Sequence, residues 1–259
     1  MNAKIIIVAI VILSSVIINA QTKIIAHRGF SGIAPENTLI AFQKAIESGA
    51  GYFELDVHKS SDGKIFVIHD KSINRTSSDD SEGVIAEMTC KEIKKLKVGY
   101  SKKFGNTFKD EKIPTLKKAL KLAKGKIKVC IEIKVGGIEK EVLEIINDLK
   151  MNNDIIIFSF YDSVLTKFHQ LDATIPTLYL KDNADNTTID YAKNINSIAI
   201  GVGYNTSITK EFLNLAHNAG IEVWKWTVND EIQMQELINT GIDGLITNYP
   251  DKGIPMIKH

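Results

Sequence analysis

Hydrophobic and polar side chains alternate strictly in a short segment near the start of the chain. In residues 52–58 the odd-numbered positions are apolar, and the even-numbered positions include Glu54 and Asp56. This two-residue period predicts a β-strand, because successive side chains of a strand point to opposite faces. The segment therefore predicts a strand with one buried face and one face that carries two carboxylates.

A second segment repeats this pattern. In residues 128–134, Glu132 and Lys134 share one face, and branched apolar side chains share the other. Cys130 has the same parity as Glu132, so we expect its thiol in the interior, one layer below that carboxylate. A disulfide with Cys90 is the alternative, but the two positions are badly placed to meet, and two free thiols are the prediction.

Strand-like runs alternate with segments of helical period along the rest of the chain. The predicted strands cover residues 24–26, 52–58, 127–134, 154–159, 177–180, 197–200, 221–227 and 244–247, with a short strand-like run at 65–68. The first predicted helix has Asn37 or Thr38 as its cap. Further helices are predicted over about 114–124, 138–151, 162–171, 186–194, 208–219 and 230–240. Repeated strand and helix units with eight main strands predict an α/β fold of the (β/α)8 TIM barrel type. A doubly wound open sheet is the alternative, and the lack of a glycine-rich phosphate motif after any strand disfavours it.

Residues 71–112 interrupt this rhythm. They are rich in Ser, Asp, Lys and Gly and contain one short helical pattern near residues 90–96. We interpret them as an insertion over one end of a single domain that covers residues 21–259.

The first twenty residues have the pattern of a secretory signal peptide. Lys4 precedes an apolar run from Ile5 to Ile18, and Asn19 and Ala20 follow it. The run is shorter than the roughly 20 residues of a spanning helix, although an uncleaved N-terminal anchor is the alternative. We therefore expect cleavage near Ala20, export to the periplasm or the medium, and no stable membrane insertion of the mature chain.

The near-neutral composition disfavours a polyanionic partner. The chain has 32 basic and 31 acidic residues, and loss of Lys4 leaves 31 of each. A neutral chain lacks the basic footprint of a nucleic-acid-binding protein, so no nucleic-acid partner is expected.

In a parallel barrel, polar residues at the carboxyl ends of the strands meet on one rim. The residues at these positions are His27, Arg28, Glu54, Asp56, Glu132, Lys134, Ser159, Phe160, Trp226 and Asn248. The carboxylates Glu54, Asp56 and Glu132 form an all-oxygen set, which predicts one divalent cation of the Mg²⁺, Ca²⁺ or Mn²⁺ kind rather than zinc.

The remaining groups on this rim fit phosphate chemistry. Arg28 and Lys134 offer positive charge for a phosphate beside the carboxylates. His27 and His69 titrate near neutrality, so that one can accept a proton and the other can donate one. Taken singly, each residue has a structural interpretation: a hydrogen-bonded histidine, a solvated strand face, an ion pair, or barrel packing for Trp224 and Trp226.

The order of several short motifs indicates a family. They are His27-Arg28-Gly29, Pro35-Glu36-Asn37-Thr38, Glu54-Leu55-Asp56-Val57, His69-Asp70, Ile113-Pro114-Thr115-Leu116, Glu132-Ile133-Lys134, Trp226-Thr227-Val228-Asn229 and the ending Gly241 to Pro250. In this arrangement the chain resembles the glycerophosphodiester phosphodiesterases from about residue 24 to Pro250. Residues 75–80 and Ser60 depart from the pattern common in that family.

The resemblance implies a (β/α)8 barrel of the phospholipase-C-like phosphodiesterase type with an insertion after its second strand. It also implies that His27 and His69 form the acid/base pair, that Glu54, Asp56 and Glu132 bind Mg²⁺ or Ca²⁺, and that Arg28 and Lys134 hold the phosphate. We expect Glu36, Phe160 and Trp226 to lie behind these groups or in the pocket wall.

The resulting hypothesis is a metal-dependent enzyme that hydrolyses small glycerophosphodiesters to sn-glycerol 3-phosphate and an alcohol. Attack by water and attack by the glycerol 2-hydroxyl through a cyclic phosphate both remain open at this point. A phospholipase on the same barrel is one rival, and it requires an apolar rim, for which Tyr100, Phe104 and Phe108 are the candidates. A binding protein that only recognises glycerophosphoryl groups is the other rival, although a binder needs no acid/base pair. The oligomeric state is not predicted.

Overall fold

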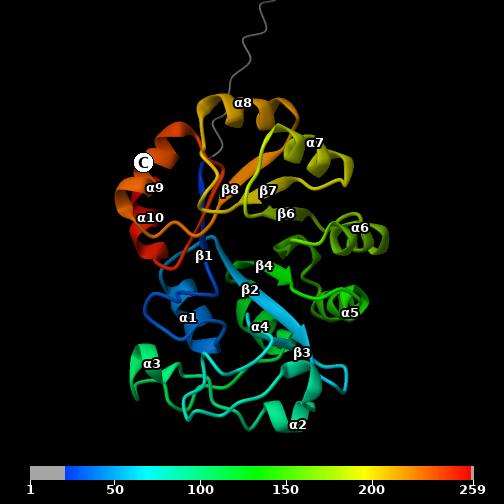
Figure 1. Cartoon of the computed structure of the whole chain (residues 1–259), viewed down its shortest axis with the longest axis vertical. Coiled ribbons are helices and arrows are strands. Elements are labelled where there is room, and N and C mark those ends of the chain that lie inside the picture. The colour runs from blue at the N-terminus through cyan, green and yellow to red at the C-terminus, as the bar shows by residue number, and fades with distance from the viewer. Residues whose placement is uncertain (1–20, 258–259) are drawn as a thin grey trace, which may run out of the picture.

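The computed structural model describes residues 21–257, so the signal-peptide prediction for residues 1–20 lies outside the described residues. Eight parallel strands close into a barrel, because β1 pairs with both β2 and β9 (Figure 1). These strands are β1 (Lys23–Ala26), β2 (Tyr52–Lys59), β4 (Lys128–Ile133), β5 (Ile155–Ser159), β6 (Thr177–Lys181), β7 (Ala199–Val202), β8 (Glu222–Lys225) and β9 (Gly244–Thr247). A further strand, β3 (Ile65–Val67), pairs antiparallel with β2. The predicted TIM barrel is confirmed, and the open sheet is wrong because closure leaves no edge between β1 and β2.

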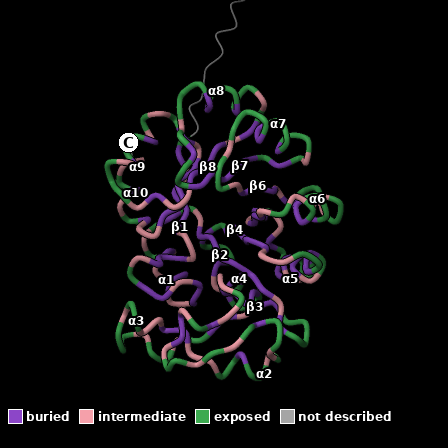
Figure 2. Tube along the Cα trace, in the orientation of Figure 1, coloured by how far each residue is buried: buried purple, intermediate pink, exposed green. Residues whose placement is uncertain are grey.

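Helices surround this barrel. They are α1 (Leu39–Glu47), α2 (Cys90–Ile93), α3 (Ser101–Phe104), α4 (Leu116–Ala123), α5 (Glu139–Leu149), α6 (Asp162–Leu171), α7 (Asn186–Asn194), α8 (Lys210–Asn218), α9 (Glu231–Thr240) and α10 (Pro250–Ile257), with 3₁₀ turns η1 (Ile85–Glu87) and η2 (Asn152–Asp154). Buried residues follow the strands, while the helices show exposed positions on their outer sides (Figure 2). None of the helices within residues 21–257 has the length and hydropathy needed to span a bilayer.

The strands have two buried faces. Their outward side chains, including Phe53, Leu55 and Val57, pack against the helices in one large apolar cluster. Their inward side chains, including Cys130 and Trp224, fill the barrel interior as a second cluster. Cys130 is therefore in the interior, as the strand parity predicts, and both Cys130 and Cys90 are free thiols.

Several element boundaries differ from the predicted ones by a few residues. The strand predicted at residues 197–200 is β7, Ala199–Val202, and the strand predicted at residues 221–227 is β8, Glu222–Lys225. The cap of α1 is Thr38, whose hydroxyl accepts a hydrogen bond from the backbone N–H of Ala41 at 3.3 Å. Asn37, the other candidate, instead hydrogen bonds to β2.

The segment between β3 and α4 contains residues 71–112 and forms a lobe at the lower end of the molecule in Figure 1. The lobe has its own apolar cluster, which includes Ile73, Ile85 and Ile93. The aromatic residues at positions 100, 104 and 108 are half-buried and stack edge-to-face on one another. They do not form an exposed apolar rim.

Candidate active site

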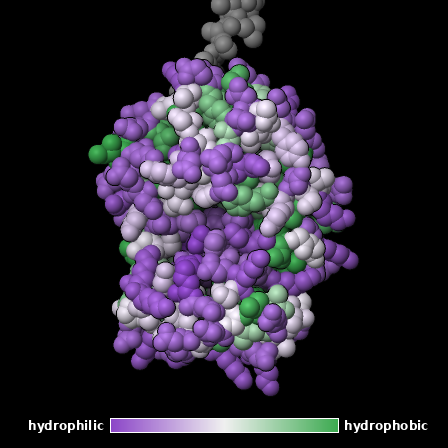
Figure 3. All heavy atoms as spheres, in the orientation of Figure 1, coloured by the Kyte–Doolittle hydropathy of each residue, from purple (hydrophilic) through white to green (hydrophobic). Residues whose placement is uncertain are grey.

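The carboxyl ends of the barrel strands enclose a cavity of about 150 Å³. Its lining residues are His27, Arg28, Glu54, His69, Glu132, Lys134, Phe158, Phe160, Leu180, Trp226 and Ile246. Hydrophilic side chains dominate the middle of the molecule in the view of Figure 3. The barrel thus brings together most residues that the strand ends predict. Ser159 is an exception, because its buried hydroxyl donates to the carbonyl of Ile133 at 3.0 Å and does not line the cavity.

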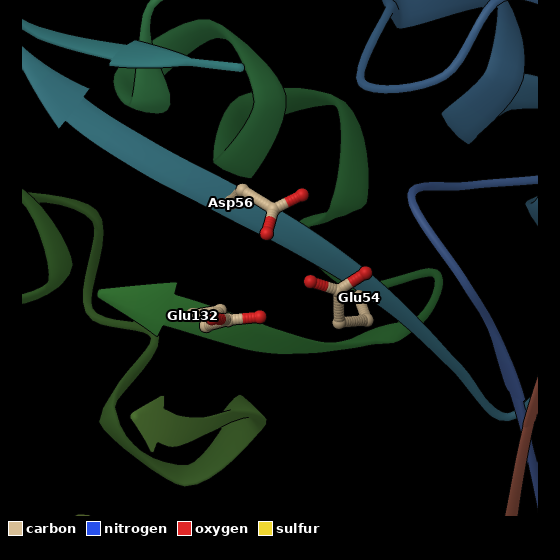
Figure 4. Close-up of side chains that lie close together, drawn as sticks. All are labelled: Glu54, Asp56 and Glu132. Carbon is tan, nitrogen blue, oxygen red and sulfur yellow. The ribbon is translucent and has the colours of Figure 1, made fainter. Parts of the chain in front are cut away.

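Three carboxylates converge within this site. Glu54 and Asp56 extend from the inner face of β2, and Glu132 extends from β4 directly beside Asp56 in the strand register (Figure 4). One oxygen from each lies within 4.8 Å of the others. Oε1 of Glu54 is buried and has no hydrogen-bond partner within residues 21–257. A buried anionic oxygen without a partner is costly, and an all-carboxylate set matches a hard divalent cation, so these residues fit the expected metal.

The titration of these carboxylates reflects their crowding. Burial, then the charges of Asp56 and Glu132, raise the pKa of Glu54 well above its usual range. Burial and the neighbouring Asp56 raise the pKa of Glu132 to about 7. Burial also opposes ionisation of Asp56, but the positive charges of Arg28 and Lys134 hold its pKa below its usual range. The metal-free site therefore holds protons where a cation is expected.

Arg28 lies between the carboxylates and the β1–α1 loop. Its backbone N–H donates to Oε2 of Glu54 at 2.8 Å, and its Nη1 donates to Oε1 of Glu36 at 2.9 Å. Its Nε lies 3.5 Å from Oδ2 of Asp56. The guanidinium is thus fixed from two sides, with Glu36 behind it as predicted.

Lys134 follows the end of β4. Its Nζ donates to Oε1 of Glu132 at 2.7 Å and lies 3.5 Å from Oδ1 of Asp56. Burial lowers the pKa of this lysine, but the two carboxylates outweigh that effect and raise it. The side chain therefore places a positive charge at the edge of the carboxylate cluster.

The two histidines of the cavity are each held through Nδ1. His27 makes a 2.7 Å hydrogen bond to Oδ1 of Asn248, an oxygen that also accepts from Ser31 at 2.9 Å. An amide oxygen only accepts, so Nδ1 of His27 carries the hydrogen and Nε2 is the nitrogen left for substrate. Burial and the charge of Arg28 lower the pKa of His27 to about 4.

His69 has a different partner. Its Nδ1 donates to Oδ1 of Asp70 at 2.6 Å, and its backbone carbonyl contacts Nε2 of His58 at 3.0 Å. Burial opposes ionisation of Asp70, but hydrogen bonds from Arg75 and His69 lower its pKa to about 2. A carboxylate at Nδ1 fixes the orientation of the ring and leaves Nε2 as the nitrogen for substrate. His58 is therefore a hydrogen-bonded structural histidine.

Several supporting residues were not assigned a role from the sequence. The Asn37 amide donates to Oδ2 of Asp56 at 2.8 Å and accepts from the Asp56 backbone at 3.2 Å. Asp70 and Arg75 lie behind His69. Only the adjacency of His69 and Asp70 offered a signal for any of these contacts, because Asn37 lies 19 residues from Asp56 and the loop that brings Arg75 to Asp70 has no periodic pattern.

The cavity wall also contains aromatic side chains. Phe160 and Trp226 meet edge-to-face with ring centroids 5.6 Å apart. Nε1 of Trp226 is buried and has no hydrogen-bond partner among residues 21–257. Trp224, by contrast, lies in the apolar interior of the barrel. The structural interpretation therefore holds for Trp224, whereas Trp226 lies in the pocket wall.

Comparisons with known proteins agree with this site. The glycerophosphoryl diester phosphodiesterase family matches residues 27–252. A glycerophosphodiester phosphodiesterase of Bacillus altitudinis is 34% identical over 90% of this chain and 97% of its own length. A putative enzyme of the same name from Bacillus subtilis is 35% identical over 91% and 98%. The solved structure of an Oleispira antarctica phosphodiesterase in complex with the product sn-glycerol 3-phosphate has a TM-score of 0.82 and 27% identity, and the match covers 92% of this chain and 97% of that one.

Proposed function

The chain belongs to the glycerophosphoryl diester phosphodiesterase family and hydrolyses glycerophosphodiesters, and we propose that it does so with a divalent cation and a histidine acid/base pair. The proposed products are sn-glycerol 3-phosphate and an alcohol. The observation that carries this proposal is the buried, unpartnered Oε1 of Glu54 within a cluster of three carboxylates. Glu54, Asp56 and Glu132 would hold Mg²⁺, Ca²⁺ or Mn²⁺, which would stabilise negative charge on the phosphoryl oxygens.

Arg28 and Lys134 contribute fixed positive charge on the same rim of the barrel. We propose that both side chains contact the phosphate, since their charges lie beside the carboxylates and a guanidinium binds two phosphate oxygens at once. The apolar wall that includes Phe160 and Trp226 excludes water and contacts the carbon atoms of the substrate.

The two histidines divide the proton transfers. His27 is held neutral by burial, and its Nε2 accepts a proton from the attacking oxygen. His69 is backed by the ionised Asp70, and its Nε2 donates a proton to the leaving alcohol oxygen. This division is part of the proposal, and a substrate with a different leaving group tests it.

The first experiment measures release of sn-glycerol 3-phosphate from glycerophosphocholine and glycerophosphoethanolamine by the mature chain. EDTA should abolish release, and Mg²⁺ or Ca²⁺ should restore it. Absence of turnover with every metal in folded protein would contradict the proposal, and lysolipid hydrolysis or simple binding would be assayed next. Phosphorus NMR of the products distinguishes direct attack by water from a cyclic phosphate.

Alanine substitutions test the histidines. We expect His27→Ala and His69→Ala each to lower kcat by about 10²–10⁴-fold with the fold intact. His217→Ala is a matched control, because this histidine contacts Asp243 on the surface rather than the cavity. An aryl diester, whose leaving group needs no protonation, should restore turnover in the His69 variant but not in the His27 variant. The reverse pattern would exchange the two roles.

The location of the protein is proposed from residues 1–20 alone. Their sequence favours export to the periplasm or the medium. If mass spectrometry shows that the exported protein begins near Gln21, cleavage near Ala20 is supported. Full-length protein retained with the membrane would contradict it.

A further inference from the structure

Arg75 extends from the start of the lobe and holds two carboxylates at once. Its Nε donates to Oδ2 of Asp70 at 2.7 Å, and its Nη2 lies 3.2 Å from Oδ1 of the same residue. Its Nη1 and Nη2 donate to Oε2 and Oε1 of Glu36 at 2.8 and 2.7 Å. All three guanidinium nitrogens are therefore used, and they connect two loops that lie on different sides of the site.

Each of these carboxylates holds a group of the proposed mechanism. Oε1 of Glu36 also accepts the 2.9 Å hydrogen bond from Nη1 of Arg28. Oδ1 of Asp70 also accepts the 2.6 Å hydrogen bond from Nδ1 of His69. Arg75 is thus the shared partner of two short chains of charged hydrogen bonds. One chain ends at the phosphate-binding arginine, and the other ends at an acid/base histidine.

We propose that Arg75 is a positioning residue that fixes the phosphate-binding group and the acid/base group relative to each other. The inference rests on the proposed function of His69 and Arg28. Groups that support catalytic or metal-binding residues in this way commonly change activity by about 10–100-fold when removed. Among the described residues, all the hydrogen bonds of the Arg75 side chain go to Glu36 and Asp70, the two carboxylates that hold Arg28 and His69, which favours a positioning role over a purely structural one.

The chemistry of the guanidinium explains why an arginine stands here. Its planar fork binds two carboxylates in fixed directions, whereas the lysine ammonium is a point charge on a flexible stem. Tyr100 of the lobe contributes its ring, 5.6 Å from the guanidinium carbon. The lobe is further joined to the β1–α1 loop by Nζ of Lys103, which donates to the carbonyl of Ser31 at 2.7 Å. The insertion therefore contributes to the site through contacts behind the cavity wall, although none of its own residues lines the cavity.

The test compares Arg75→Met and Arg75→Lys with a control in the same lobe. Lys97→Met breaks the ion pair with Asp110 at 2.6 Å, which lies away from the cavity, and should leave kcat and KM unchanged. For glycerophosphocholine we expect Arg75→Met to lower kcat by about 10–100-fold and to raise KM, with Arg75→Lys between it and the wild type.

A second substrate separates positioning from general damage. On an aryl diester, protonation of the leaving group is not needed, so the loss of kcat through Asp70 and His69 should shrink to a few fold. The increase in KM through Glu36 and Arg28 should persist. Equal losses of kcat on both substrates, or kinetic constants within twofold of the wild type, would overturn the inference. The Lys variant gives the same comparison where the Met variant does not fold.

A readout without turnover keeps this inference separate from the proposed function. The ring ¹⁵N signals of His69, assigned with the His69→Ala spectrum, should shift in Arg75→Met and stay in place in Lys97→Met. Unchanged His69 signals in Arg75→Met would refute positioning even where the wild type is active. A wild type without glycerophosphodiesterase activity would refute the proposed function, while shifted signals would still support the contact chain.

Discussion

Replacing one of the three candidate metal ligands should stabilise this protein when no metal is bound. The substitution is Glu132→Gln, which keeps the size of the side chain and an oxygen that accepts from Nζ of Lys134 at the position of the 2.7 Å contact. In the metal-free protein, burial and the charge of Asp56 raise the pKa of Glu132 to about 7. Ionised Glu132 therefore opposes folding, and Gln removes that charge.

The magnitude follows from the difference between folded and unfolded pKa values. The ordinary value is 4.5, so between pH 4.5 and 7 the folded chain binds more protons at Glu132 than the unfolded chain does. The contribution of Glu132 to the free energy of unfolding is therefore fully present below pH 4.5, and it is lost as the pH rises through 7. By pH 8 the loss is about 3 kcal/mol, and at pH 5 it is below about 1 kcal/mol.

The assay is urea unfolding in EDTA at pH 5 and pH 8. Glu132→Gln should exceed the wild type by about 3 kcal/mol in unfolding free energy at pH 8, with a small difference at pH 5. Glu144→Gln, the same change on the exposed face of α5, should lie within about 0.5 kcal/mol of the wild type at both pH values. A Glu132→Gln protein that is less stable than the wild type at pH 8 would refute the reasoning. With metal present the order should reverse, because only the wild type keeps all three ligands.

Of three further predictions, two concern the carboxylate site and one concerns the buried Lys225, which lies outside the cavity lining. Asn37→Ala should weaken Mg²⁺ or Ca²⁺ binding by about 10–100-fold in calorimetry, because Oδ2 of Asp56 loses its 2.8 Å amide partner. Lys225→Met should lower the free energy of unfolding by about 3 kcal/mol in urea, because the buried Nζ donates to three loop carbonyls that lose their partner. Metal binding at pH 6 should release about two protons per ion, measured in buffers of different ionisation enthalpy; release of none would place the ion elsewhere.

Local patterns were enough to predict the barrel and the carboxylate cluster. Alternation places Glu54 and Asp56 on one face of a strand, and the closed barrel then brings Glu132 beside them, since β2 and β4 pair in register. Both steps depend on strand geometry, which can be deduced from segments of a few residues. The sequence therefore contained most of the information on where the candidate metal ligands lie.

The supporting contacts needed three-dimensional information. Arg75 and Glu36 are separated by 39 residues, and nothing in the serine-rich segment around Arg75 distinguishes it from a solvated loop. Asn37 and Thr38 are both good helix caps, and the choice between them depends on Asp56, 19 residues away. Contacts of this kind arise from how loops meet over the barrel, which periodicity does not describe.

The balance of charge around the cavity explains why a divalent ion suits it. Three carboxylates have lowered pKa values and three cations have raised ones: Glu36, Asp56 and Asp70, and Arg28, Arg75 and Lys134. Among the described residues at the site, these six groups balance one another. Glu54 and Glu132 are left, and burial together with the neighbouring carboxylates raises the pKa values of both. Below about pH 7 protons therefore neutralise them in the metal-free protein. An ion of charge two would replace those protons, whereas a monovalent ion would leave one buried carboxylate uncompensated, so the charge arrangement favours the proposed divalent cation.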